Sequence, residues 1–77
     1  MATISKEELF VNVGKKIRLY REAKGLSQQD LAALCNFEKS NLSRLEAGRT
    51  NPTISTLFKI SQALEIQLSD LLVFNNG

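Results

Sequence analysis

The sequence has no histidine and no tryptophan, and it contains only one cysteine, one proline and one tyrosine. A single cysteine excludes an internal disulfide, and the lack of histidine removes the usual metal-site spacings. We therefore expect Cys35 to be a small buried filler. There is no signal peptide and no apolar run long enough to cross a bilayer, so we expect a cytoplasmic protein without a membrane partner. The 77 residues predict one small domain, 1–77, that needs no metal or cofactor.

The formal net charge of +2 is modest, but it is unevenly distributed. Residues 1–25 carry six basic and three acidic side chains, residues 26–51 are balanced, and residues 52–77 have one negative charge in excess. A negatively charged partner is thus expected to meet the N-terminal half. The imbalance is too small to identify nucleic acid by itself.

The stretch 26–48 predicts two short helices joined by a sharp corner. Ser27 is a favourable N-cap for the first helix, residues 28–34, because its hydroxyl can accept from a backbone N–H of the first turn. Asn36 suits the left-handed corner, and the second helix spans residues 38–48. The side chains of the first helix that are expected to pack inward are Leu31, Ala32 and Leu34.

The second of these helices has two chemically different faces. Leu42 and Leu45 are expected to point toward the core, whereas the outward face is formed by Lys39, Ser40, Asn41, Ser43 and Arg44. Short hydrogen-bonding groups with two long cations match base edges and phosphates in a DNA major groove. An ordinary solvated helix face is the alternative, and the complete unit of cap, helix, corner and helix favours DNA.

A capping box at residues 5–8 predicts the start of a first helix that ends at Gly25. Gly14 marks either a close helix–helix approach or a bend. The inward side chains of this helix are expected to be Leu9, Phe10, Val13, Ile17 and Tyr20.

After Pro52, Thr53 is expected to cap a fourth helix, residues 54–64, which ends in a corner at Glu65. A short fifth helix, residues 68–73, should follow. The inward side chains of the fourth helix are expected to be Ile54, Leu57, Ile60 and Leu64, with Phe58 partly buried.

A spaced set of residues between about 10 and 73 matches the pattern of a known family, namely 13–18, Arg21, 24–28, Leu31, Ala32, Ser40, Leu42, Ser43, Leu45, Glu46, Gly48, Pro52, Leu57, Lys59, Ile60, Ala63, Leu64, Leu71 and Leu72. In these residues the sequence resembles the lambda-repressor/Cro type of helix-turn-helix domain, the XRE family. The resemblance implies an all-α, five-helix lambda-repressor-like domain with the helix-turn-helix in helices two and three. It also implies a usually dimeric protein that binds double-stranded DNA at partly palindromic operators.

By this resemblance, Gln28 contacts a DNA phosphate, and Lys39, Ser40 and Arg44 face base edges. Asn41 and Ser43 are secondary contacts, and the loop 49–51 approaches the neighbouring backbone. The predicted DNA-binding set is Ser27, Gln28, Gln29, Glu38, Lys39, Ser40, Asn41, Ser43, Arg44, Arg49, Thr50 and Asn51. Two positions depart from the family pattern. Glu38 replaces a better-capping residue, and Lys39 stands where Gln occurs in some members, which favours guanine or phosphate over adenine.

The resemblance also predicts a structural ion pair between Arg21 and Glu46. The C-terminal stretch 68–74 contains five apolar residues, more than one side of so short a helix can bury. We expect Leu71 in the core, and a homodimer interface formed by Leu68, Leu72 and Phe74. The alternative is that all of these side chains close the core of the monomer.

The sequence thus favours a sequence-specific DNA-binding transcriptional regulator that acts as a dimer. An antitoxin or adaptor whose main partner is another protein is the alternative. An enzyme is disfavoured because there is no histidine and no Ser or Cys paired with a plausible base. No small-molecule ligand is evident.

Overall fold

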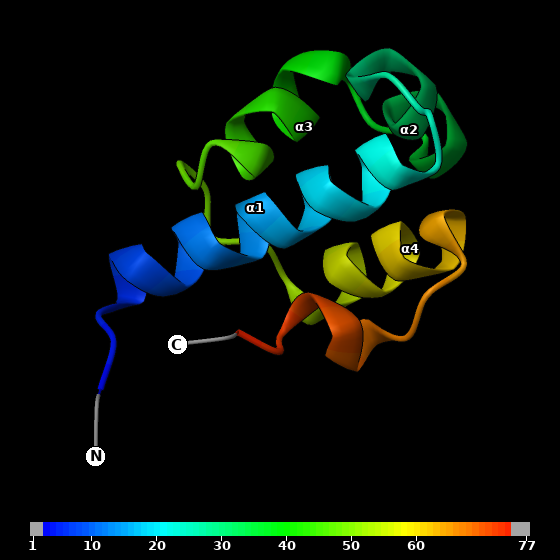
Figure 1. The fold of residues 1–77 in the computed structure, drawn as a ribbon. Helices are drawn as coiled ribbons and strands as arrows, with labels where there is room; N and C mark the ends of the chain where they lie inside the picture. Colours follow the sequence, from blue (N-terminus) through cyan, green and yellow to red (C-terminus); the bar gives the residue numbers. More distant parts are fainter. Residues whose placement is uncertain (1–2, 75–77) are drawn as a thin grey trace.

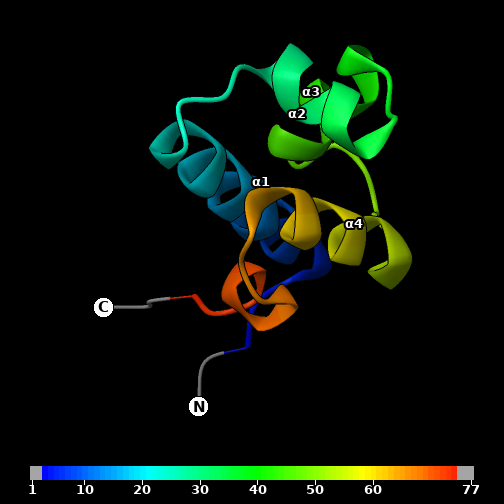
Figure 2. The same cartoon turned by 90° about the vertical axis from the view of Figure 1, so that its right-hand side faces the viewer.

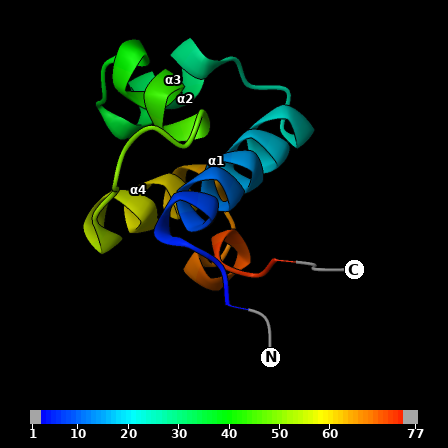
Figure 3. The same cartoon turned by 90° about the vertical axis from the view of Figure 1, so that its left-hand side faces the viewer.

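The computed structural model describes residues 3–74, and all regular elements within this range are helical. The element order along the chain is α1 (Lys6–Ala23), α2 (Gln28–Cys35), α3 (Lys39–Glu46), α4 (Ile54–Leu64) and the 3-10 helix η1 (Leu68–Leu71). The predicted all-α fold is therefore confirmed. The long helix α1 crosses the middle of the molecule in Figure 1, with α3 above it and α4 and η1 below it. Figures 2 and 3 show that α2 and α3 stay together on one side of α1.

The helix starts follow from local hydrogen bonding. At the start of α1, the Glu8 N–H donates to Ser5 Oγ at 3.1 Å, and the Ser5 N–H donates back to Glu8 Oε1 at 3.2 Å. Thr53 caps α4 by accepting from the Thr56 N–H at 3.1 Å. These side chains satisfy donors that a helix leaves without a partner in its first turn. Only α3 lacks such a cap among the four α-helices, because Glu38 makes no capping hydrogen bond.

Two of the left-handed corners are formed by residues other than glycine. Asn36 after α2 and Glu65 after α4 both have φ 59°, ψ 41°, which is the left-handed region. The Phe37 N–H donates to the Ala32 carbonyl at 2.8 Å, and the Ile66 N–H donates to the Ser61 carbonyl at 3.0 Å. These bonds satisfy carbonyls at the helix ends and reverse the chain. Both predicted corners are confirmed.

One continuous apolar core fills the space between the helices. Its fully enclosed side chains come from every helix and include Ile17, Leu31, Leu42, Ile60, Leu64 and Leu71. Cys35 is 3% exposed, so the predicted buried filler is confirmed. Burial raises the pKa of the Cys35 thiol, which keeps it protonated and unreactive near neutral pH.

The predictions for Leu34 and Ile54 were wrong, because these side chains are 62% and 63% exposed. The buried side of α2 runs through Leu31, Ala32 and Cys35, which leaves Leu34 to one side. Ile54 is the first residue of α4 and lies almost one turn before Leu57, the first buried residue of that helix. The fifth element is also shorter than predicted, a 3-10 helix that ends at Leu71 instead of an α-helix to residue 73.

At Gly14, α1 lies very close to the backbone at the end of α3. A Cβ at this position would lie 2.6 Å from the Leu45 carbonyl oxygen and 2.8 Å from the Glu46 carbonyl carbon. The contacting atoms are backbone atoms and cannot rotate away. Of the two interpretations of Gly14, the structure supports the close helix–helix approach. This contact sets the distance between α1 and the end of α3.

Candidate nucleic-acid interface

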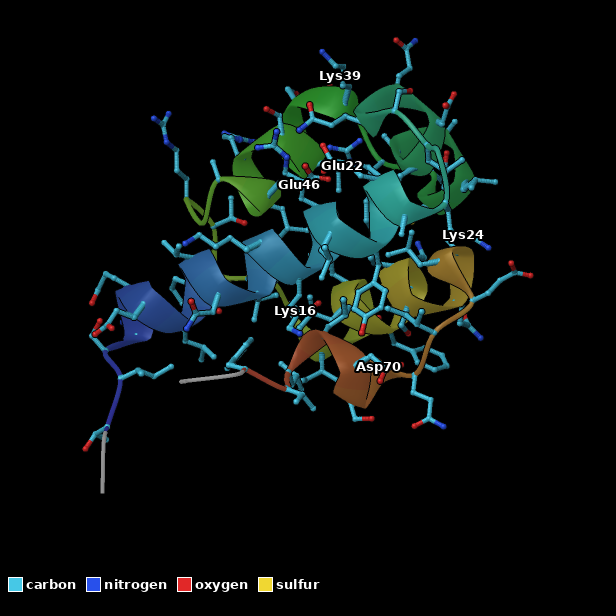
Figure 4. All side chains as sticks on the ribbon, viewed as in Figure 1. Lys16, Glu22, Lys24, Lys39, Glu46 and Asp70 are labelled. Atoms are coloured by element: carbon cyan, nitrogen blue, oxygen red, sulfur yellow. The ribbon has the colours of Figure 1, made fainter. Side chains whose placement is uncertain are left out.

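Helix α3 is held by one buried side and presents the other to solvent. Leu42, Leu45 and Glu46 are 0%, 6% and 8% exposed, respectively. The side chains predicted to point outward are all exposed, namely Lys39, Ser40, Asn41, Ser43 and Arg44. Lys39 lies on the side of α3 away from α1 in Figure 4. The predicted division of this helix into two faces is therefore present.

Arg44 is oriented by a neighbour on the same face. Its Nη2 donates to Asn41 Oδ1 at 2.6 Å. A guanidinium has five N–H donors, so most of them stay free for another acceptor. The loop after α3 is tied to the same helix, because the Arg49 N–H donates to the Arg44 carbonyl at 2.9 Å. Arg49 and Asn51 are exposed, and Thr50 is partly buried.

The start of α2 supplies the second part of the predicted site. Ser27 and Asp30 form a reciprocal capping box, with both hydrogen bonds at 3.0 Å. The bond that the Ser27 backbone N–H donates to the Asp30 carboxylate is the main cause that lowers the pKa of Asp30, and the nearby Ser27 side chain adds to it, which keeps the carboxylate ionised at the helix start. Gln29 and Glu38 are exposed, and Gln28 is partly buried.

The predicted ion pair between Arg21 and Glu46 is present and buried. Arg21 Nε donates to Glu46 Oε2 at 2.6 Å, and Arg21 Nη2 donates to Glu46 Oε1 at 3.0 Å. The two side chains are 9% and 3% exposed. The bonds to the Glu46 carboxylate raise the pKa of Arg21 despite the opposing effect of desolvation. A third donor, Arg21 Nη1, binds the Leu26 carbonyl at 2.7 Å.

Sequence reasoning missed the contact that links this pair to Gln28. Gln28 Nε2 donates to Glu46 Oε1 at 3.1 Å, so one carboxylate oxygen accepts from both Gln28 and Arg21. Gln28 begins α2 and Glu46 ends α3, and no spacing rule relates residues on separate helices. Figure 4 shows the Glu46 side chain between α3 and α1.

The basic side chains differ in whether they have an acidic partner. In the N-terminal third, Arg18 pairs with Glu22, Arg21 with Glu46 and Lys24 with Glu65. Three of the six cations in residues 1–25 are therefore paired, and two of their partners, Glu46 and Glu65, lie outside this segment and offset part of its excess positive charge. Around α3, by contrast, Lys39, Arg44 and Arg49 have no acidic partner within residues 3–74. Lys39, Arg44 and Arg49, which belong to the predicted DNA-binding set, are therefore free of acidic partners within residues 3–74.

Two other kinds of site find no support in the part of the chain that the structure describes. Residues 3–74 contain no cluster of three or more acidic, cysteine or histidine side chains able to hold a metal ion. Within the same range, no helix combines the length and apolar character that crossing a membrane requires.

Two short helices at a left-handed corner, the second with a polar outer face, define a helix-turn-helix domain. The model of the helix-turn-helix family HTH_3 matches residues 17–71. The chain belongs to this family.

Known proteins support this assignment. The HTH-type transcriptional regulator SlrR of Bacillus subtilis is 45% identical over 60 residues, which are 77% of this chain and 40% of SlrR. The crystal structure of the hypothetical transcription factor NHTF from Neisseria has a TM-score of 0.83 at 29% identity, covering 95% of this chain and 84% of NHTF. The crystal structure of SinR, a master regulator of biofilm formation, in complex with DNA has a TM-score of 0.75 at 39% identity, covering 79% of this chain and 98% of that one.

The buried ion pair makes a prediction about stability. Glu46→Ala should lower the free energy of unfolding by about 3 kcal/mol, because it leaves the buried Arg21 guanidinium without its counter-ion. The matched control is Glu22→Ala, which removes an exposed partner of Arg18 and should cost less than about 1 kcal/mol. Urea unfolding followed by circular dichroism measures both values. Equal stability of Glu46→Ala and the unchanged protein would show that the pair contributes nothing.

Proposed function

We propose that this chain is a sequence-specific transcriptional regulator that binds a partly palindromic DNA operator as a homodimer. The observation that carries the proposal is the outward face of α3. This face presents five exposed polar side chains while the opposite side of the helix is buried. The major groove of DNA is wide enough to admit an α-helix, and α3, a helix of eight residues, could enter it with this face toward the bases.

The side chains around α3 divide into two groups by the kind of DNA atom they suit. Lys39, Ser40 and Arg44 lie along the outward face and are the proposed base-reading residues. Arg44 is the strongest of these, because a guanidinium can donate to N7 and O6 of guanine at once. Its hydrogen bond to Asn41 limits its rotamers before DNA arrives and reduces the entropy lost on binding.

The proposed backbone contacts lie at the two ends of the helix-turn-helix. Ser27, Gln28 and Gln29 are at the start of α2, where backbone N–H groups and the helix dipole favour an anion. Arg49, Thr50 and Asn51 follow the end of α3. Phosphate contacts of this kind position a protein on the duplex, whereas base contacts select the sequence.

The proposed homodimer rests on the C-terminal residues. Leu71 is fully buried, and Leu68 and Phe74 pack against the core while staying partly exposed. Leu72 and Val73 are 40% and 61% exposed. Two adjacent apolar side chains left in solvent at the end of the described chain are a surface that a second copy could cover. A partly palindromic operator follows from the two-fold symmetry of such a dimer.

Selection of bound sequences from a random DNA pool tests the function. We expect enrichment of one short motif, repeated in inverted orientation with a fixed spacing. No enrichment, together with a stoichiometric protein that co-purifies with the chain, would instead favour an antitoxin or adaptor. An enriched motif without inverted symmetry would retain the DNA-binding function and reject the dimer geometry.

The role of each side chain is tested by binding to the preferred and to a scrambled site across a salt series. Arg44→Ala should cost roughly 1–3 kcal/mol at the preferred site and relax the preference at one base pair per half-site. Its effect on the scrambled site should be small. Equal losses at both sites would identify Arg44 as a phosphate anchor and reject the base-reading role.

Backbone contacts serve as the comparison in the same titrations. Arg49→Ala should weaken binding to all sequences and reduce the salt slope by roughly one unit, because one fewer counter-ion is released. Gln28→Ala should also weaken all sequences alike but leave the slope unchanged, since an amide carries no charge. Lys16→Ala is the charge-matched control, because Lys16 lies on the side of α1 away from α3 in Figure 4.

Sedimentation velocity tests the dimer in the absence of DNA. We expect a dimer at tens of micromolar protein, roughly the concentration range of a weak regulatory association. Leu72→Ser should shift the protein to monomer, whereas Leu19→Ser, which alters a 57% exposed leucine on α1, should not. A purely monomeric protein at these concentrations would contradict the proposed interface.

A further inference from the structure

The Glu46 carboxylate lies where the scaffold and the proposed DNA-binding surface meet. Its two oxygens accept three side-chain hydrogen bonds, two from Arg21 and one from Gln28. Arg21 and Glu46 are buried, while Gln28 is partly exposed at the first position of α2. A buried charge pair is thus in direct contact with a side chain that reaches solvent.

This contact fixes which end of the Gln28 amide faces inward. An ionised carboxylate is only an acceptor, so Gln28 must turn its NH₂ group toward Glu46. One N–H is then used inside the protein, and the second N–H of the same nitrogen remains unassigned. Without Glu46, the Gln28 side-chain amide could rotate by half a turn, and its carbonyl oxygen would then take the position of the NH₂ group. A carbonyl oxygen would repel a phosphate, whereas an N–H would bind it.

The charge of Glu46 would by itself oppose this role. A lone carboxylate close to the start of α2 would repel a DNA phosphate. Arg21 removes that obstacle, because it binds both carboxylate oxygens and makes the pair neutral overall. The arrangement therefore provides a strong acceptor for Gln28, and the neutral pair adds no further negative charge to that of the Asp30 carboxylate at the start of α2.

We infer that Glu46 is a positioning residue for DNA-backbone binding, which holds the Gln28 amide with one N–H directed to a phosphate. This inference rests on the proposed DNA-binding function. Its energetic basis is preorganisation: a side chain whose rotamer is already fixed loses less entropy when it contacts a ligand. Glu46 would thus contribute to DNA affinity without touching DNA, in addition to stabilising the fold.

The first measurement needs no variant. In the free protein, the side-chain amide of Gln28 should show restricted motion in ¹⁵N NMR relaxation. The neighbouring Gln29 side chain, which is exposed on the same helix, should be mobile and serves as the internal control. A Gln28 side chain as mobile as that of Gln29 would overturn the inference.

The second measurement is a double-mutant cycle in DNA binding. Arg21→Met combined with Glu46→Leu replaces the buried pair by apolar residues of similar volume, an exchange that often preserves stability. Gln28→Ala should weaken DNA binding roughly two- to tenfold in the original protein, the range expected for one hydrogen bond. In the Arg21→Met/Glu46→Leu background, the same change should alter affinity by less than about twofold. Circular dichroism confirms that both backgrounds are folded.

The outcomes separate this inference from the function on which it rests. If selection with the original protein enriches no sequence from the random DNA pool, the proposed function fails and the inference fails with it. If the original protein binds DNA and Gln28→Ala has equal effects in both backgrounds, only the positioning role of Glu46 is rejected. If the double variant does not fold, the NMR comparison of Gln28 and Gln29 decides.

Discussion

The buried pair between Arg21 and Glu46 is the interaction on which the arrangement of this domain depends. It joins α1 to the end of α3 with two hydrogen bonds, and a third from Arg21 to the Leu26 carbonyl fixes the segment that leads into α2. Desolvating two charges is costly unless their hydrogen-bonding capacity is used. Among residues 3–74 no buried side-chain polar atom lacks a partner. The close approach at Gly14, one position of α1 without a Cβ, brings the two helices near enough for the pair to form.

Much of the fold could be predicted because its signals are local. The caps at Ser5, Ser27 and Thr53 and the left-handed corners at Asn36 and Glu65 depend on a few adjacent residues, and all are present. The limits of the buried faces could not be predicted in this way. Helical periodicity gives the direction of an apolar stripe, but neighbouring helices decide how wide and how long the covered part is. Leu34 and Ile54 lie just outside it.

The candidate site shows the same division. The exposed face of α3 follows from residue spacing within one helix, and the Arg21–Glu46 pair follows from family resemblance. The bond from Gln28 to Glu46 depends on how α2 and α3 cross, which no pattern within either helix contains. The charge available on the surface likewise depends on the fold, because Arg21 and Lys24 pair with Glu46 and Glu65, which are distant in the sequence.

The missing cap at the start of α3 has a wider consequence. This helix has eight residues and no capping side chain, and isolated helices of this length are not stable in water. Its shape is therefore imposed by the rest of the domain, through Leu42, Leu45 and Glu46. The outward side chains, in turn, add almost nothing to the core. Surface chemistry and folding are thus encoded by different residues of one short segment, so the outward positions can be exchanged for new ones while the scaffold stays intact. A domain built in this way can acquire new binding preferences by substitution at a few exposed positions. Such substitutions cost little stability, so no stabilising change is needed beforehand.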